Sequence, residues 1–182
     1  GYLAGLFRAV DPGFDPDFEA RVLARFPELE LKQRIAWIAE NLVPALPRDF
    51  PAAAGIIDAA LPPPLDPTRS DDDFGDFIFA PLGEYAVLQG LKDHPARALD
   101  LIEALPQRFS MEYASRPFIN RWPDAPFDRL EDWAGHDSYH VRRLVSEGTR
   151  PRLPWGIGIT TDMARPLPLL DRLHADRARF VT

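Results

Sequence analysis

The sequence predicts an all-α protein built from stacked antiparallel helix pairs, in the manner of a HEAT-like α-solenoid. Apolar residues recur three and four positions apart along most of the chain, as in amphipathic helices, and strand-type alternation is scarce. Proline accounts for 20 of the 182 residues, so the helices are expected to be short, with firm ends. Because no strict sequence repeat is present, the stack is inferred from helix length and short loops. We expect a single domain over residues 1–182.

Three helices are predicted in the first third of the chain. Segments 14–27 and 30–45 each place apolar side chains at helical spacing. Segment 49–61 forms the third helix, with Asp49 in a position to cap its N-terminus. The proline-rich run 61–67 cannot continue a helix, so a loop is expected there.

The middle of the chain carries three further predicted helices. Segment 76–91 is apolar and is expected to be buried, with Pro81 bending or breaking the helix. Segment 95–106 begins with a proline, which suits the first helical turn. Segment 110–120 begins at Ser110, a favourable N-cap residue.

The last third of the chain is expected to continue the same pattern. Segment 126–134 is short and ends before a glycine. Segment 137–147 begins with a capping residue and ends at Gly148, which is typical of a helix C-terminus. Segment 162–174 forms the next helix, and another is expected to begin near Asp176.

Composition and motifs exclude several classes of function. The chain has no cysteine, which excludes disulfides, thiolate metal sites and cysteine nucleophiles and fits a reducing cytoplasm. No apolar run reaches the roughly 18 residues that a membrane span needs. The acidic run 71–73 with Asp76 is more typical of a polar loop than of a cation site. His136 and His140 are four apart, but no HExxH or GxSxG motif is present, so we expect no metal and no cofactor.

The charge of the chain is unevenly distributed. The net charge of −7 is unusual for a nucleic-acid-binding protein. Residues 1–90 carry −8, whereas residues 91–182 carry +1 and the stretch 140–182 carries +4. Of the 14 basic residues after residue 90, 13 are arginines, whose planar guanidinium groups suit phosphate. An anion could therefore bind to one face of the protein.

Two predicted helices place a carboxylate and an arginine four positions apart. Glu112 and Arg116 have this spacing, as do Arg143 and Glu147 in segment 140–156, where they lie opposite an apolar stripe. Residues at this spacing face the same way on a helix. From spacing alone, the simplest interpretation of each pair is a surface ion pair.

The predicted helix over 137–147 is followed by an unusual loop. Two prolines stiffen this loop, and they are expected to hold Arg150, Arg152 and Trp155 outward. Composition alone also fits a charged helix followed by a purely structural loop.

These segments resemble a known family. Segment 109–119 (FSMEYASRPFI) resembles the FxxEFAxRPF segment of the AlkC/AlkD superfamily of alkylpurine DNA glycosylases. Segment 140–155 (HVRRLVSEGTRPRLPW) is very similar to its HVRRLxSEGxRPRLPW signature, nearer the AlkC branch, and residues 29–51 look like the amino-terminal helices of that branch. The resemblance extends over roughly residues 14–182. It implies HEAT-like repeats curved around duplex DNA and hydrolysis of the N-glycosidic bond of cationic bases such as 3-methyladenine.

The resemblance also implies roles for individual residues. The catalytic positions of the family fall on Glu112, Glu147 and Trp155. Contacts to DNA are expected from four arginines, Arg116, Arg143, Arg150 and Arg152. Arg116 and Arg143 are also expected to keep the two carboxylates ionised through charge pairing. The expected partner is double-stranded DNA with alkylated bases, bound by a cytoplasmic monomer without cofactor, metal or membrane.

The chain departs from the family pattern at two places. Family members often carry Asn-Glu before the HVRR sequence, whereas Ser138 and Tyr139 precede His140 here. Members usually continue into another helix with an acidic residue in the cleft, whereas this chain stops at Thr182, so a truncated DNA-binding surface is expected. The alternative to a glycosylase is a non-catalytic HEAT-like scaffold that binds DNA structures or a protein partner.

Overall fold

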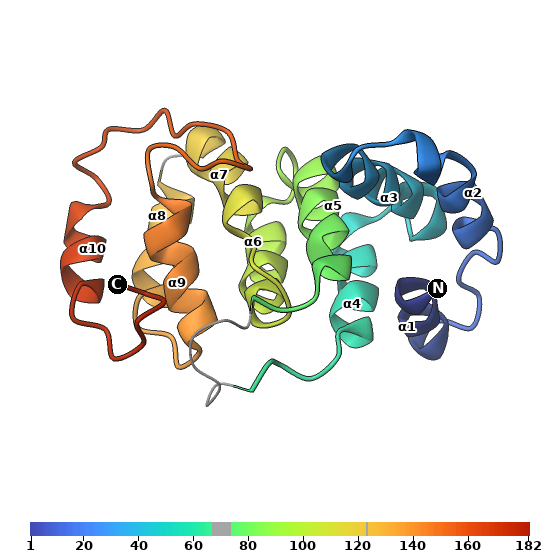
Figure 1. The fold of residues 1–182 in the computed structure, drawn as a ribbon, viewed down its shortest axis with the longest axis horizontal. Helices are drawn as coiled ribbons and strands as arrows, with labels where there is room; N and C mark the ends of the chain where they lie inside the picture. Colours follow the sequence, from blue (N-terminus) through green and yellow to red (C-terminus); the bar gives the residue numbers. More distant parts are fainter. Residues whose placement is uncertain (67–73, 123) are drawn as a thin grey trace.

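The computed structural model describes residues 1–66, 74–122 and 124–182 (Figure 1). Within these ranges it contains ten α-helices, three short 3₁₀ helices and no β-strand, so the all-α prediction is confirmed. None of the described helices is long and apolar enough to cross a membrane. The acidic run 71–73 lies outside the described residues.

The helices follow one another along the chain with short connections. The α-helices are α1 (Tyr2–Val10), α2 (Phe18–Arg25), α3 (Leu31–Ala45), α4 (Phe50–Ala60), α5 (Ala80–Gly90), α6 (Pro95–Ala104), α7 (Glu112–Arg121), α8 (Ala125–Trp133), α9 (Tyr139–Gly148) and α10 (Leu167–Leu173). The 3₁₀ helices are η1 (Phe26–Glu28), η2 (Phe77–Phe79) and η3 (Leu105–Gln107).

The nine helical segments predicted between residues 14 and 174 each coincide with a helix, but several local predictions are wrong. Helix α1 was not expected, and the chain after Asp176 forms turns rather than a helix. Pro81 does not bend a helix, because it lies in the first turn of α5, where a proline is tolerated. Asp49 does cap α4, since its carboxylate accepts the backbone N–H of Ala52 at 3.0 Å. Ser110 does not cap α7, because the N-cap residue of this helix is Met111.

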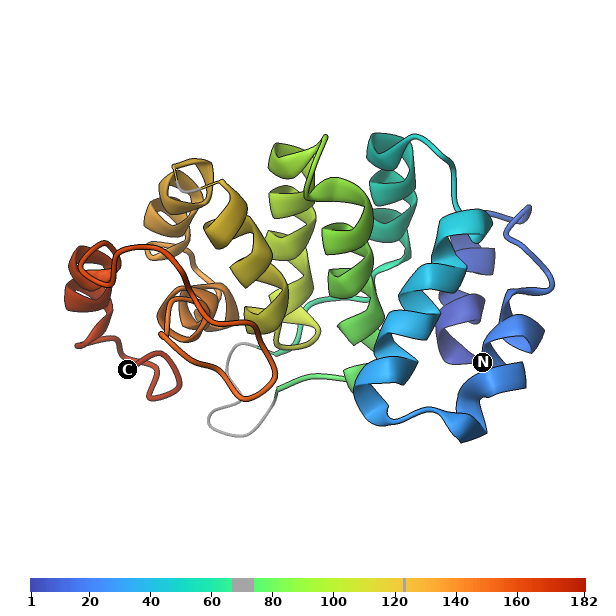
Figure 2. The same cartoon turned by 90° about the horizontal axis from the view of Figure 1, so that it is seen from above.

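The helices form two rows that pack against each other (Figures 1 and 2). In one row, here called the inner row, α3, α5, α7 and α9 contact one another in turn. In the second, outer row, α1, α4, α6 and α8 do the same. From α3 to α9, successive helices therefore alternate between the rows, which is the arrangement of stacked helix pairs.

The core lies between the two rows. Its largest buried apolar side chains come from both of them, and they include Leu42, Ile57, Tyr85, Leu101, Phe118 and Trp133. Burial of one such side chain stabilises the fold by about 1.5–3 kcal/mol, so the rows hold their relative positions firmly. The inner row therefore offers a rigid support for side chains on its exposed face.

Candidate active site

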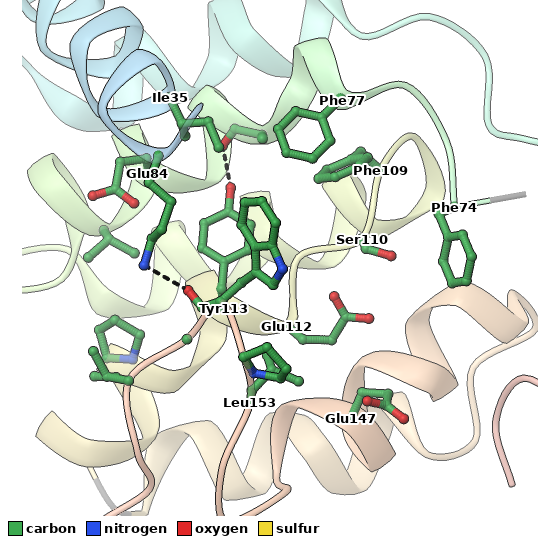
Figure 3. A pocket seen from close by; sticks show the side chains of 18 of the residues that line it. Ile35, Phe74, Phe77, Glu84, Phe109, Ser110, Glu112, Tyr113, Glu147 and Leu153 are labelled. Carbon is green, nitrogen blue, oxygen red and sulfur yellow. Dashed lines mark hydrogen bonds between the residues drawn. The ribbon is translucent and has the colours of Figure 1, made fainter. Parts of the chain in front are cut away.

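A cavity of about 720 Å³ opens on the inner row (Figure 3). Helices α3, α5, α7 and α9 contribute to its wall, and the loop after α9, residues 149–158, closes one side. Its lining is rich in aromatic rings and carboxylates: Phe74, Phe77, Phe109, Tyr113, Trp155, Glu84, Glu112 and Glu147. Two cations, Lys32 and Arg143, also line it. The three predicted catalytic residues thus share one pocket.

Glu112 is the first residue of α7, and its side chain is almost completely buried, with 7% of the residue exposed. Arg143 of α9 donates to the Glu112 carboxylate and, at 3.0 Å, to the hydroxyl of Ser110. The same guanidinium lies over the ring of Phe74, 5.1 Å from its centroid. Arg143 therefore has both polar and aromatic partners. Its ion pair in turn fixes the position of the Glu112 carboxylate.

The pKa of the Glu112 carboxyl is raised, and the main cause is burial, because loss of water penalises the charged form. The positive charge of Arg143 opposes this effect, and the negative charge of Glu147 adds to it. Figure 3 shows the two carboxylates on neighbouring helices at the same side of the pocket.

Glu147 lies in the last turn of α9 and is half-buried. Its carboxylate accepts a hydrogen bond from Arg150 at 2.8 Å. The two ion pairs expected within single helices, Glu112 with Arg116 and Arg143 with Glu147, are therefore not found among the described residues. Arg143 crosses to Glu112, and Glu147 pairs with an arginine of the following loop.

Trp155 lies in the loop after α9 and is 46% exposed, with its ring at the pocket. The ring contacts Phe77 edge-on at a centroid distance of 6.2 Å. The backbone carbonyl of Trp155 accepts a hydrogen bond from Lys32 of α3 at 3.1 Å. The indole is thus open to a ligand while its backbone is tied to the opposite side of the pocket.

Arg116 does not fit its predicted role as a DNA contact. Its residue surface is 0% exposed, and its guanidinium donates to three backbone carbonyls, those of Gly148, Pro151 and Ile157. A side chain buried against the loop cannot reach a phosphate, and it forms no ion pair with Glu112 among the described residues. Arg116 lies one helical turn after Glu112, where the loop after α9 covers this face of α7.

The other two arginines are accessible. The Arg150 side chain is 58% exposed, and Arg152 is exposed in the same loop. Both follow α9 directly and precede Trp155, so they lie in the segment that borders the pocket. Among the predicted DNA-binding residues, these two are best placed to meet a phosphate backbone.

Sequence reasoning missed a second part of the pocket wall. Lys32 and Glu84 come from α3 and α5, far from the two signature segments, and no motif marks them. Glu84 is half-buried, and burial raises the pKa of its carboxyl, while the charge of Lys32 opposes that shift. Tyr113 also lines the pocket, and the sequence could have indicated it, since it follows Glu112 directly in the signature segment 109–119. Its hydroxyl donates to the Ala80 carbonyl and so ties α7 to α5.

No group of three or more histidine, aspartate or glutamate side chains in the described ranges could hold a metal ion. The site consists of carboxylates, arginines and aromatic rings. Such a set suits a ligand that combines positive charge with a flat apolar face.

No protein-family model matches this chain. The uncharacterized protein YhaZ of Bacillus subtilis (strain 168) is 32% identical to it over 162 residues, which cover 87% of this chain and 42% of YhaZ. The solved structure of the Pseudomonas fluorescens alkylpurine DNA glycosylase AlkC, bound to DNA containing an abasic site analog, superposes with a TM-score of 0.83. That likeness has 29% sequence identity and covers 99% of this chain and 48% of AlkC.

The chain thus spans less than half the length of each of these two proteins. The superposition extends over 99% of this chain, at a sequence identity of 29%. The resemblance to the AlkC branch of the alkylpurine DNA glycosylases, inferred from three segments of the sequence, is therefore confirmed over nearly the whole chain.

Proposed function

We propose that the protein is a DNA repair glycosylase that hydrolyses the N-glycosidic bond of cationic alkylated purines, such as 3-methyladenine, in duplex DNA. One observation carries the proposal: Glu112, Glu147 and Trp155 converge in one pocket on a fold similar to that of AlkC. A cytoplasmic, monomeric and metal-independent enzyme is part of the same proposal. Its chemistry rests on the side chains of the chain itself.

The chemistry follows from the charge of the substrate. An N3- or N7-alkylated purine is positively charged and leaves as a neutral base, so it needs little acid catalysis. When the bond from C1′ to the base nitrogen breaks, positive charge develops on the deoxyribose. Fixed carboxylates stabilise that charge, and one of them can orient the water that adds to C1′ and accept its proton. Glu112 and Glu147 are the carboxylates in this role.

The aromatic lining supports the same ligand. The exposed indole of Trp155 offers a face to a cation, an attraction worth about 0.5–2 kcal/mol. Phe77 and Phe109, whose ring centroids lie 4.8 Å apart, extend the apolar wall beside it. A positively charged base or sugar would therefore meet both negative charge and π-faces in this pocket.

DNA affinity is expected to depend on the arginines of the loop. Replacing both Arg150 and Arg152 by alanine should weaken binding and flatten its dependence on salt, by about 0.9 in the logarithmic slope for each lost phosphate contact. Fluorescence anisotropy with duplex DNA at several salt concentrations would measure the effect. Arg8→Ala, on α1 of the outer row, serves as the control for loss of a positive charge. A double variant with the parental affinity and slope would show that DNA binds elsewhere.

The proposed activity has a direct test. Purified protein is incubated with methylated duplex DNA, and the released bases are separated by chromatography. Release of free 3-methyladenine supports the proposal. DNA binding without any base release would instead support a scaffold.

The scaffold remains the second candidate because of the charge of the chain. Residues 1–90 carry −8, which opposes DNA over that half of the molecule. A non-catalytic HEAT-like protein that binds DNA structures or a protein partner would tolerate this charge. It would not require two carboxylates beside an exposed indole, and for this reason we place it second.

A further inference from the structure

We infer that Arg116 and Asn120 are positioning residues, through which α7 sets the place of the Trp155 indole relative to the Glu112 carboxylate. The inference rests on the proposed glycosylase function and adds a specific role for these two residues. It starts from the face of α7 that carries Glu112, Arg116 and Asn120 at intervals of four residues. Side chains at this interval lie above one another on one side of a helix.

The three residues on that face have different contacts. Glu112 lines the pocket. Arg116, one turn later, holds the carbonyls of Gly148, Pro151 and Ile157, at 3.0 Å for Gly148 and 3.1 Å for Pro151. These carbonyls come from both ends of the loop after α9. One guanidinium therefore forms hydrogen bonds with both the start and the end of the loop that carries Trp155.

Asn120 forms hydrogen bonds with the backbone at the C-terminal end of the same loop. Its amide nitrogen donates to the carbonyl of Gly158 at 2.9 Å, and its amide oxygen accepts the backbone N–H of Thr160 at 2.9 Å. The side chain thus pairs with the loop backbone in both directions. Together, Arg116 and Asn120 fix the loop on either side of Trp155.

The burial of Arg116 indicates a specific role. A fully buried guanidinium normally needs a carboxylate to offset the loss of water, and no carboxylate within the described ranges pairs with this one. The backbone carbonyls of the loop replace the carboxylate as partners of the guanidinium. One of them, the Gly148 carbonyl, lies at the negative end of the α9 dipole. Because loop carbonyls replace water around the cation, displacement of the loop would leave a buried charge unsatisfied.

The loop has little structure of its own to oppose these side chains. Its backbone hydrogen bonds include those from Arg150 to the Glu147 carbonyl at 3.3 Å, from Gly156 to the Leu153 carbonyl at 3.2 Å, and from Ile159, just after the loop, to the Pro151 carbonyl at 3.2 Å. Other contacts of the loop are the hydrogen bond from Lys32 to the Trp155 carbonyl, the ion pair of Arg150 with Glu147, and the ring contact of Trp155 with Phe77. Side chains outside the loop therefore supply many of the hydrogen bonds that hold it.

Gly156 gives an independent sign of close fit between the loop and Arg116. A Cβ atom added at Gly156 would lie 2.7 Å from Cδ of Arg116 and 3.1 Å from its Nε. Only a residue without a side chain lets the backbone next to Trp155 approach the arginine this closely. Gly156→Ala should therefore move the loop without removing any hydrogen-bonding group.

The test compares Arg116→Met, Arg116→Lys, Asn120→Ala and Gly156→Ala with the parent. Arg142→Met is the control for loss of a buried arginine, since Arg142 is also buried and holds the backbone carbonyls of His136 and Asp137 and the carboxylate of Asp176, all away from the Trp155 loop. Single-turnover excision and DNA affinity are measured separately. The indole N–H signals in a nitrogen-15 NMR spectrum report on Trp155, whose signal is assigned with Trp155→Phe.

We expect Arg116→Met and Gly156→Ala to lower the excision rate at least about tenfold, because a displacement near 1 Å can cost about a hundredfold. DNA affinity should change less than about threefold, and the Trp155 signal should shift or broaden. Arg116→Lys should recover part of the rate, and Asn120→Ala should act in the same direction with a smaller effect. Arg142→Met should lower the melting temperature but leave the Trp155 signal and the excision rate near the parental values.

Two results would overturn the inference. One is an unchanged Trp155 signal in Gly156→Ala and Asn120→Ala, which keep Arg116 and test the loop even where Arg116→Met fails to fold. The other is a loss of excision in Arg142→Met as large as in Arg116→Met, which would mark both as general stability effects. If the parent itself releases no base, the proposed function fails, while the NMR signal still decides whether α7 positions Trp155.

Discussion

Replacement of Glu112 by glutamine is expected to lower the rate of base excision about a hundredfold or more, with DNA affinity and folding almost unchanged. Glutamine keeps the shape of the side chain and removes the charge that would stabilise the sugar cation. Loss of one well-placed electrostatic group typically has an effect of this size. Glu147→Gln is expected to act similarly, because Glu147 lines the same side of the pocket.

Single-turnover excision from a duplex with one alkylated base measures both variants. Glu131→Gln is the control, since Glu131 is exposed on α8 of the outer row. Parental rates in both Glu112→Gln and Glu147→Gln would identify the carboxylates as structural ion pairs. The scaffold would then become the leading function.

Replacement of Arg143 by glutamine is expected to lower the rate of base excision, and alkaline conditions are expected to reverse this loss. Burial already raises the pKa of the Glu112 carboxyl, and Arg143 provides the positive charge that opposes this shift. Without Arg143 the pKa rises further, so a larger fraction of Glu112 is protonated and inactive. The ionised fraction falls about tenfold for every pH unit below the pKa.

The sign of the pH dependence distinguishes this effect from simple damage to the site. A carboxylate with a raised pKa becomes ionised as the pH increases through that pKa, so the acidic limb of the excision rate should lie above the usual range for glutamate in the parent. In Arg143→Gln the limb should move to still higher pH, whereas Glu112→Gln should show no recovery there. An acidic limb at the same pH in the parent and in Arg143→Gln would contradict the assigned pairing.

Arg150→Gln is the matched control for this experiment. Arg150 also pairs with a pocket carboxylate, that of Glu147, but its side chain is 58% exposed. Water and salt screen such a pair, whose contribution is typically about 0–1 kcal/mol. We therefore expect Arg150→Gln to leave the acidic limb almost in place.

The helices themselves could be predicted because their signals are local. Apolar spacing within α3 and the aspartate that caps α4 act within a few residues of the chain, whatever the rest of the fold does. Helix α1 shows the limit of such signals. It has nine residues and no side-chain cap, so its own stability is marginal, and it is held by packing against α4.

The sequence by itself predicted three residues that line the pocket, since the two signature segments contain Glu112, Glu147 and Trp155. It could not determine how the charges pair. Spacing of four residues allows Glu112 to meet Arg116, but the rotation of α7 against its neighbours turns Arg116 toward the loop and brings Arg143 to Glu112 instead. Those rotations are set by the packing of whole helix faces.

Only the tertiary structure joined the two signature segments to the rest of the pocket. Lys32 and Glu84 enter through α3 and α5, because alternate helices lie side by side in the inner row. A contact of this kind links residues that are about 30–120 positions apart in the sequence, as in the hydrogen bond from Lys32 to Trp155. No local pattern encodes it, since its energy comes from burial of side chains that meet after the helices have stacked.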